Sequence, residues 1–140
     1  MNQTLKQLFL VFALALLTNG CDRSSEATSD LQREIGTVSL KVDFGGDKPD
    51  KQIDVVCSAD STVLLSLQRA QNMNGLAFQS SGSGETAFVQ SIDGVDNVTD
   101  GKSWIYHVND ELADKSAGIK TVKPGDVITW SYGTPPDELH

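Results

Sequence analysis

The most constraining feature of the sequence is a pair of stretches near its end in which large rings recur at every second position. Both tryptophans and both tyrosines of the chain lie there: Trp104, Tyr106, Trp130 and Tyr132. Because alternate side chains of a β-strand point to the same face, residues 104–109 and 127–132 are each predicted to form a strand with one apolar face. The connection between them ends in Lys123-Pro124-Gly125-Asp126, where Pro followed by Gly favours a type II turn.

A second strand pair is predicted earlier in the chain. Residues 37–44 alternate between polar side chains and an apolar set, which comprises Val38, Leu40, Val42 and Phe44. Turn-forming residues follow at 45–50, and the alternation resumes over 53–57, so the two strands are predicted to pair as an antiparallel hairpin. Cys57 falls on the apolar face and is expected to be a buried small side chain.

One helix is predicted, over about 61–74. Asp60 and Ser61 are residue types that cap helix N-termini, and Gly75 is a natural stop. The apolar residues between them fall at helical spacing: Val63, Leu64, Leu67 and Ala70. This stripe predicts a helix that packs across a sheet.

A further hairpin is predicted from residues 76–78 and 88–92, which flank a polar tip. A hairpin followed directly by a crossing helix is typical of the β-grasp. The predicted fold class is therefore α+β, with a β-grasp-like mixed sheet of about five to six strands crossed by one helix. In this arrangement the first and last strands, 38–44 and 127–132, lie side by side at the centre.

Residues 1–20 are predicted to be a signal peptide. An apolar run from Leu8 to Leu17 follows Lys6, and at about 1.5 Å per residue it covers roughly half of a ~30 Å hydrocarbon core. Gly20-Cys21 resembles the bacterial lipobox, although Thr18 stands where leucine is usual. We expect lipid on Cys21 to anchor the protein to a bacterial membrane; the alternative is secretion of a soluble chain after ordinary cleavage at the same bond.

The predicted signal peptide and lipid site determine how the rest of the chain is divided. Asp22 resembles the residue that retains enteric lipoproteins in the inner membrane, which favours the periplasmic face of that membrane. Residues 21–35 are polar and are predicted to form a flexible, lipid-proximal tether. The folded domain is expected over 36–134, and residues 135–140 are expected to be a disordered tail.

The charge balance excludes one class of partner. The chain has 11 basic and 19 acidic side chains, and removal of residues 1–20 takes away only Lys6, which leaves a net charge of −9. A surface this acidic repels phosphate backbones, so no nucleic acid is expected as a partner. The length of 140 residues allows one domain with a modest core.

The pattern as a whole is similar to the transcobalamin-like C-terminal domain family, a bacterial domain of unknown function. The segments that carry the resemblance, within residues 38–133, are Thr62-Val63-Leu64, Ile92-Asp93-Gly94, Trp104-Ile105-Tyr106, Val108-Asn109, Pro124-Gly125-Asp126 and Trp130. Asp110 replaces the glycine that the family usually has after the asparagine. The resemblance implies a β-grasp fold without a catalytic centre, related to the small domain that closes over the corrin ring in vertebrate cobalamin carriers. Those carriers also have a large helical domain with no counterpart here, so cobalamin-related binding is a distant alternative.

The expected function is non-enzymatic binding of a small molecule or a glycan-like ligand. Pockets combine apolar walls with a few oriented polar groups, and the candidate ligand-binding residues are Tyr132, Trp104, Tyr106, His107, Asn109 and Trp130. Asn97 is a further polar neighbour, and Tyr132, near the end of its strand, is expected to be more exposed than the tryptophans. The competing interpretation is that the four rings are core residues.

The main alternative is a protein-interaction role, as an accessory subunit of a membrane or exported complex, with a partner strand on an open sheet edge at 53–57 or 88–92. No enzyme is expected, because His107 has no carboxylate or serine at a catalytic spacing. No cofactor or metal is expected, since Cys57 has no second cysteine or histidine at ligand spacing. An unacylated Cys21 could form a disulfide with Cys57.

Overall fold

The computed structural model describes residues 34–136. The predicted signal peptide, the lipid site Cys21, most of the predicted tether and the last four residues, 137–140, lie outside the described residues. The elements in chain order are β1 (Gly36–Asp43), β2 (Lys51–Cys57), β3 (Ser61–Thr62), α3 (Val63–Asn74), β4 (Phe78–Ser81), the 3-10 turn η1 (Gly84–Thr86), β5 (Phe88–Ile92), β6 (Val95–Asp96), β7 (Ser103–Val108), β8 (Glu111–Leu112), β9 (Thr121–Val122) and β10 (Val127–Gly133).

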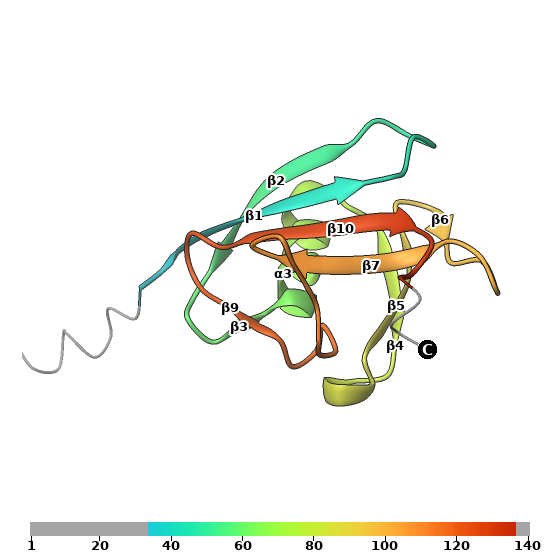
Figure 1. Ribbon diagram of the computed structural model, residues 1–140. Coiled ribbons are helices and arrows are strands. Elements are labelled where there is room, and N and C mark those ends of the chain that lie inside the picture. The colour runs from blue at the N-terminus through green and yellow to red at the C-terminus, as the bar shows by residue number, and fades with distance from the viewer. Residues whose placement is uncertain (1–33, 137–140) are drawn as a thin grey trace, which may run out of the picture. The chain divides into compact units, whose positions relative to one another are not determined.

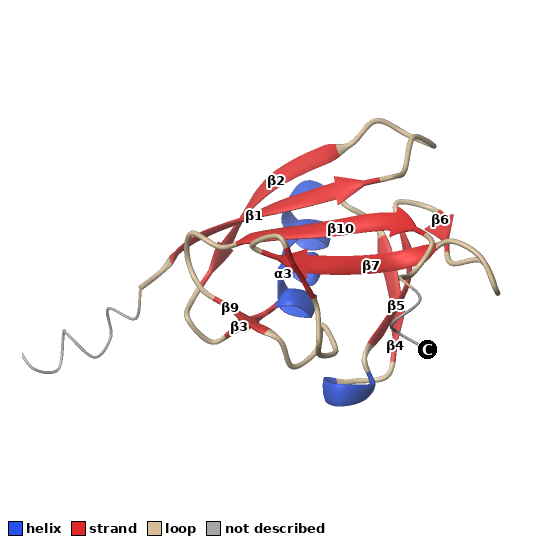
Figure 2. Cartoon of the chain, in the orientation of Figure 1, coloured by secondary structure: helices blue, strands red, loops and turns tan. Residues whose placement is uncertain are grey.

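The main sheet has five strands in the order β2-β1-β10-β7-β8. β1 and β10 pair in parallel, and the other neighbours are antiparallel. Helix α3 crosses behind this sheet (Figures 1 and 2). The predicted mixed α+β class is confirmed, as is the central pairing of the first and last strands: Leu40 lies beside Ile128, and Val42 lies beside Trp130.

The sheet has one apolar face and one polar face because the strands alternate. The face toward α3 carries the buried core, which includes Val38, Leu40, Val42, Val55, Cys57, Trp104, Tyr106, Ile128, Trp130 and Tyr132, and α3 adds Val63, Leu67 and Ala70. We call the opposite side the outer face; its residues include Lys41, Thr129 and His107, which neighbour one another across β1, β10 and β7. Burial of the apolar side chains on the face toward α3 drives the packing of the helix against the sheet.

The helix begins two residues later than predicted. Thr62, and neither Asp60 nor Ser61, is the N-cap, and its side chain accepts a hydrogen bond from the Leu65 N–H at 3.2 Å. The reason is tertiary, because β3 pairs antiparallel with β9 and holds Ser61 in a strand. The predicted stop is confirmed, since Gly75 caps the helix with a φ of 71°.

The second predicted hairpin forms, but in a sheet of its own. β4, β5 and β6 make a three-stranded sheet in that order. β5 is therefore its central strand, and the prediction of an open edge at 88–92 is wrong. The other predicted edge, 53–57, is confirmed as part of β2, which is an outer strand of the main sheet. None of the helices within residues 34–136 has both the length and the apolarity to cross a membrane.

Candidate functional site

The four large rings belong to the core. They stack in pairs, Trp104 with Tyr132 at 5.2 Å between ring centroids and Tyr106 with Trp130 at 5.0 Å. The exposed fractions are 6% for Trp104, 7% for Tyr106, 2% for Trp130 and 7% for Tyr132. The interpretation of these rings as core residues is therefore confirmed. Tyr132, expected to be more exposed than the tryptophans, is nevertheless buried, and its hydroxyl donates to the Asp96 carbonyl at 2.9 Å.

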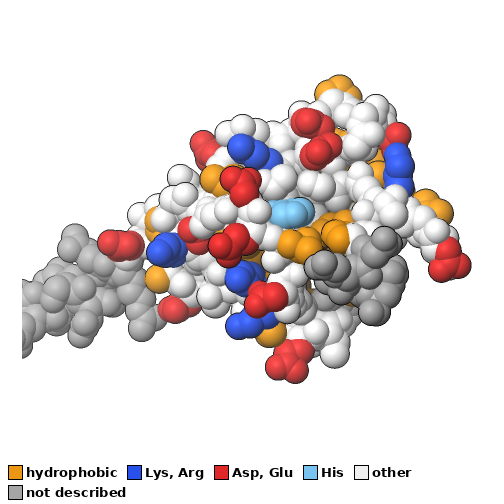
Figure 3. Space-filling view, in the orientation of Figure 1, with side chains coloured by type: hydrophobic (Ala, Val, Ile, Leu, Met, Phe, Trp, Pro, Cys, Tyr) orange, Lys and Arg blue, Asp and Glu red, His pale blue; other side chains and the backbone are white. Residues whose placement is uncertain are grey.

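The polar candidates do not converge with the rings. Asn109 closes the β7–β8 turn, where its amide donates to Asp126 Oδ1 and its Oδ1 accepts from the Val127 N–H, both at 2.9 Å. Asn97 is likewise committed to the backbone, since it accepts from the Trp104 N–H at 2.8 Å and donates to the Val89 carbonyl at 2.9 Å. His107 is half-buried on the outer face, where Figure 3 shows it in pale blue beside a group of hydrophobic side chains.

Two of the six candidates, Trp104 and Tyr106, line a hollow that runs along the outer edge of β7. Its volume is ≈ 300 Å³. One wall is the strand segment Ser103–Tyr106, and the other comes from Leu112, Ala113 and Lys115, with Pro135 from the C-terminal segment. We call this hollow the β7-edge pocket.

The edge of β7 is open along this pocket because β8 is short. β8 pairs only with His107 and Val108, and beyond it the Ala113 N–H donates to the Tyr106 carbonyl at 3.1 Å. The Asn109 N–H bonds to the Val127 carbonyl of β10, so by alternation the backbone groups of Trp104 and Tyr106 point the other way, toward the pocket. Within residues 34–136, the Trp104 carbonyl and the Tyr106 N–H have no hydrogen-bond partner.

The Tyr106 side chain fixes the far wall of the pocket. Its hydroxyl donates to the Lys115 carbonyl. Burial, and secondarily the negative charge of Asp114, raises the pKa of Tyr106 to about 12. The phenol is therefore neutral at physiological pH and binds the Lys115 segment as a hydrogen-bond donor.

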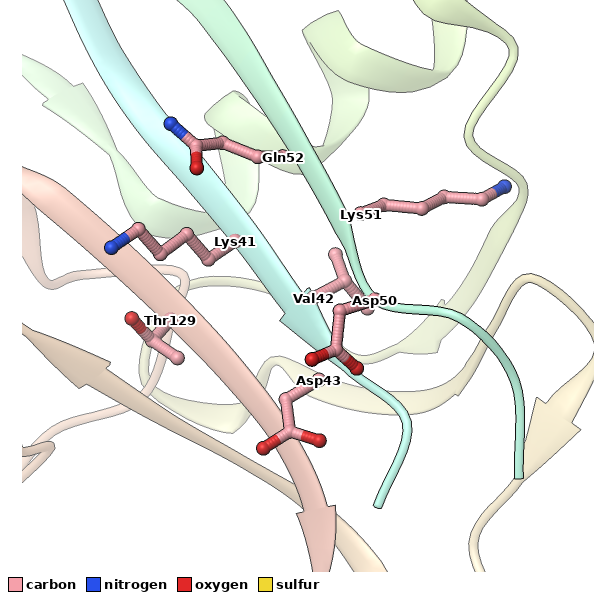
Figure 4. A pocket seen from close by; sticks show the side chains of 7 residues that line it. All are labelled: Lys41, Val42, Asp43, Asp50, Lys51, Gln52 and Thr129. Atoms are coloured by element: carbon pink, nitrogen blue, oxygen red, sulfur yellow. The ribbon is translucent and has the colours of Figure 1, made fainter. Parts of the chain in front are cut away.

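A second hollow of ≈ 470 Å³ lies on the outer face where β1 meets β2 (Figure 4). Its carboxylates are already committed, because Asp43 accepts from the Gly45 N–H at 2.8 Å and Asp50 accepts from the Phe44 N–H at 3.3 Å. In Figure 4 the side chains of Lys41 and Lys51 point to opposite sides, and Lys51 forms an ion pair with Asp93 at 2.7 Å. Asp43, Asp50 and Lys51 therefore already have partners and stabilise the β1–β2 turn.

Neither thiol nor metal chemistry is apparent in the part of the chain that the structure describes. Cys57 is 1% exposed, and burial raises the pKa of its thiol, so the reactive thiolate is disfavoured. Among residues 34–136, no group of three or more His, Cys, Asp or Glu side chains could hold a metal ion.

Sequence reasoning did not find most of the β7-edge pocket. The missed residues are Ser103, Ile105, Leu112, Ala113, Lys115 and Pro135. One signal was available: Asn109-Asp110 after a strand favours a tight hairpin turn. Both residues have positive φ, 51° and 67°, so the turn forms although Asp110 replaces glycine.

Comparisons with known proteins agree with this fold. Haptocorrin in complex with Cbi is similar with a TM-score of 0.61 and 20% identity over 73% of this chain, which spans only 26% of the haptocorrin chain. A candidate metal-binding protein from Ruminococcus gnavus ATCC 29149 is similar with a TM-score of 0.53 and 16% identity, over 72% of this chain and 99% of that one. A search of curated proteins finds no match. A family match covers residues 60–134, more than half of the 140 residues, and the chain therefore belongs to the family described as Domain of unknown function (DUF4430).

Proposed function

We propose that this chain is a non-enzymatic binding module, exported and held at a bacterial membrane by lipid on Cys21, that takes a small ligand into the β7-edge pocket. The observation that carries the proposal is a pair of backbone groups along a hollow of ≈ 300 Å³, the Trp104 carbonyl and the Tyr106 N–H, which have no hydrogen-bond partner among residues 34–136. Binding sites of small ligands combine such oriented polar groups with apolar walls and begin at about this volume.

The walls indicate the kind of ligand. Ile105, Leu112 and Ala113 supply apolar surface, and Lys115 supplies a cation at the rim. These features favour a compact molecule with an apolar part and an adjacent hydrogen-bond donor and acceptor. A glycan-like ligand is less well supported, because the buried rings offer no exposed face on which a sugar could stack. Haptocorrin is similar in fold and is described in complex with Cbi, which keeps cobalamin-related binding as a distant alternative.

The position of the pocket suits a tethered module. Ser103, at the start of β7, pairs with Gly133 at the end of β10, and β10 runs parallel to β1. The open segment therefore lies at the end of the sheet opposite Gly36, where the chain enters from the predicted tether. Changing Cys21 to Ser is expected to move the exported protein from the membrane fraction to the soluble fraction.

The binding proposal is tested with a library of small molecules and amide chemical shifts of the isotope-labelled exported chain. Ligands are expected to shift the amides of 103–106 and 112–115. Leu112→Ala is expected to weaken binding about three- to tenfold, because it removes apolar contact area. Ile119→Ala is the matched control, since Ile119 is 39% exposed and Leu112 is 37% exposed, but Ile119 does not line the pocket. Ligands that map elsewhere, or equal effects of the two variants, would contradict the proposal.

A further inference from the structure

We infer that the segment after Pro136, Asp137-Glu138-Leu139-His140, lies across the mouth of the β7-edge pocket and pairs the Glu138 carboxylate with the Lys115 ammonium group. In this position the segment competes with the ligand, so the chain inhibits binding at its own pocket. The inference rests on the proposed function, because it concerns the regulation of the same pocket.

Pro135 leads the chain onto the pocket. Strand β10 ends at Gly133, which pairs with Ser103 at the start of β7. Two residues later Pro135 is half-buried and forms part of the pocket wall. The segment 137–140 therefore starts beside the hollow, and at about 3.6 Å per residue it reaches up to about 14 Å. This length is sufficient to cross a hollow of ≈ 300 Å³.

The two consecutive prolines, Pro135 and Pro136, set the direction of the segment. Each proline ring fixes φ at about −65°, and the residue before a proline is held extended, so this stretch favours a polyproline II helix. That helix has about three residues per turn, which directs Glu138 to the same side as Pro135 and directs Asp137 to another side. The stiffness of the two prolines also reduces the conformational entropy that is lost on docking.

Lys115 is the cation that this segment meets. Lys115 is exposed at the rim of the pocket, and none of the ion pairs within residues 34–136 involves it. The neighbouring Asp114 pairs instead with Lys120, at 3.7 Å between Oδ1 and Nζ. The chain has a net charge of −8, so most of its surface repels an acidic segment. An unpaired lysine close to Pro135 is therefore a favourable partner for Glu138.

The contact requires no strand added to β7. Ala113 occupies the position beside Tyr106, since its N–H bonds the Tyr106 carbonyl at 3.1 Å. The segment instead crosses the rim of the pocket, where Ile105 is half-buried and Leu112 is 37% exposed. Docking removes part of this apolar surface from water, which adds to the charge pairing.

The test compares four isotope-labelled exported chains that all carry Cys21→Ser: the parent, a chain that stops after Pro136, and the variants Glu138→Gln and Asp137→Asn. Removal of the segment is expected to shift the amides of Leu112 and Lys115 and to leave those of α3 unchanged. Glu138→Gln is expected to shift the same two amides in the same direction. Asp137→Asn is the matched control, because it removes the same charge from the neighbouring residue, and it is expected to leave both amides near their parent positions.

Ligand binding provides the second measurement. Small molecules that bind the β7-edge pocket are expected to bind the shortened chain about three- to tenfold more tightly than the parent, because the segment no longer occupies the pocket. Glu138→Gln is expected to raise the affinity in the same direction. Since this variant keeps the full length, its effect does not arise from the new terminal carboxylate on Pro136.

The outcomes separate this inference from the proposed function. If the shortened chain keeps the parent amide shifts, or if Asp137→Asn acts as strongly as Glu138→Gln, the inference is overturned. Equal affinity of the parent and the shortened chain for a small molecule in the pocket also overturns the inference, while the proposed function stands. If removal of the segment shifts the pocket amides but no small molecule shifts them in the shortened chain, the segment is the occupant of the pocket and the proposed function is overturned.

Discussion

The Trp104 indole N–H donates to the Val95 carbonyl at 2.7 Å, which ties the main sheet to the smaller β4-β5-β6 sheet. The other tryptophan differs in this respect. Trp130 Nε1 is buried and has no hydrogen-bond partner in the described part of the chain. Two buried indoles of similar exposure, 6% and 2%, therefore differ in whether the polar atom is satisfied.

Replacing Trp104 or Trp130 by phenylalanine is expected to lower the free energy of unfolding by different amounts. Trp104→Phe leaves the Val95 carbonyl without its donor, whereas Trp130→Phe removes a donor that has no partner. Because an unsatisfied buried group costs about 1–3 kcal/mol, Trp104→Phe is expected to lower the free energy of unfolding by about 1–2 kcal/mol more than Trp130→Phe. Urea unfolding followed by circular dichroism measures the difference, and equal losses would contradict this account.

The β7–β8 turn offers a stabilising substitution. Asp110 has a φ of 67°, a conformation in which glycine is less strained than other residues. Asp110→Gly is expected to raise the free energy of unfolding by up to about 1 kcal/mol. Asp47→Gly is the control, because Asp47 is an exposed turn residue without a positive φ, and it is expected to bring no gain. A loss of stability in Asp110→Gly would argue against the turn geometry.

Acid stability is expected to depend on Asp93. The hydrogen bond from Lys51, followed by the charges of Lys51 and Lys48, lowers the pKa of Asp93 below its ordinary value of 3.8. The stabilisation is therefore complete above that value and is lost as the pH falls through the lower pKa of the folded state. Asp93→Asn is expected to cost up to about 1 kcal/mol at neutral pH, and the difference from the parent is expected to shrink in acid. A difference that does not change with pH would contradict this prediction.

Alkaline stability is expected to depend on Tyr106. Its pKa is raised from 10.0 in an exposed tyrosine to about 12, mainly by burial. The unfolded chain therefore loses this proton at lower pH than the folded protein, and stability falls as the pH rises from 10 to 12. Tyr106→Phe is expected to lack this part of the alkaline loss. The measurement is the unfolding midpoint in urea as a function of pH for both proteins, and identical alkaline profiles would show that Tyr106 titrates normally.

The long strands could be predicted because their alternation is local. The period of two in β1, β2, β7 and β10 is visible in the sequence, and so is the glycine that ends α3. The two-residue strands β3, β6, β8 and β9 carry no periodic signal. β3 exists only because Thr121 and Val122, far along the chain, pair with Ser61 and Thr62. That pairing displaced the predicted start of the helix.

The site was harder to predict than the fold. The residues chosen for their aromatic character are mostly core, because large rings supply the buried area that a small domain needs. The β7-edge pocket instead depends on where β8 stops and on how the Lys115 segment is held by Tyr106. Both are long-range features of packing, and the residues involved have no distinctive chemistry in the sequence.

The most direct test of the account is the exchange rate of the Tyr106 amide in the free protein. The account predicts that this amide exchanges much faster than those of Ile105 and His107, which bond to β10 on the other side of the strand. If all three amides were equally protected, the β7 edge would be closed, and the binding site proposed for it would be contradicted.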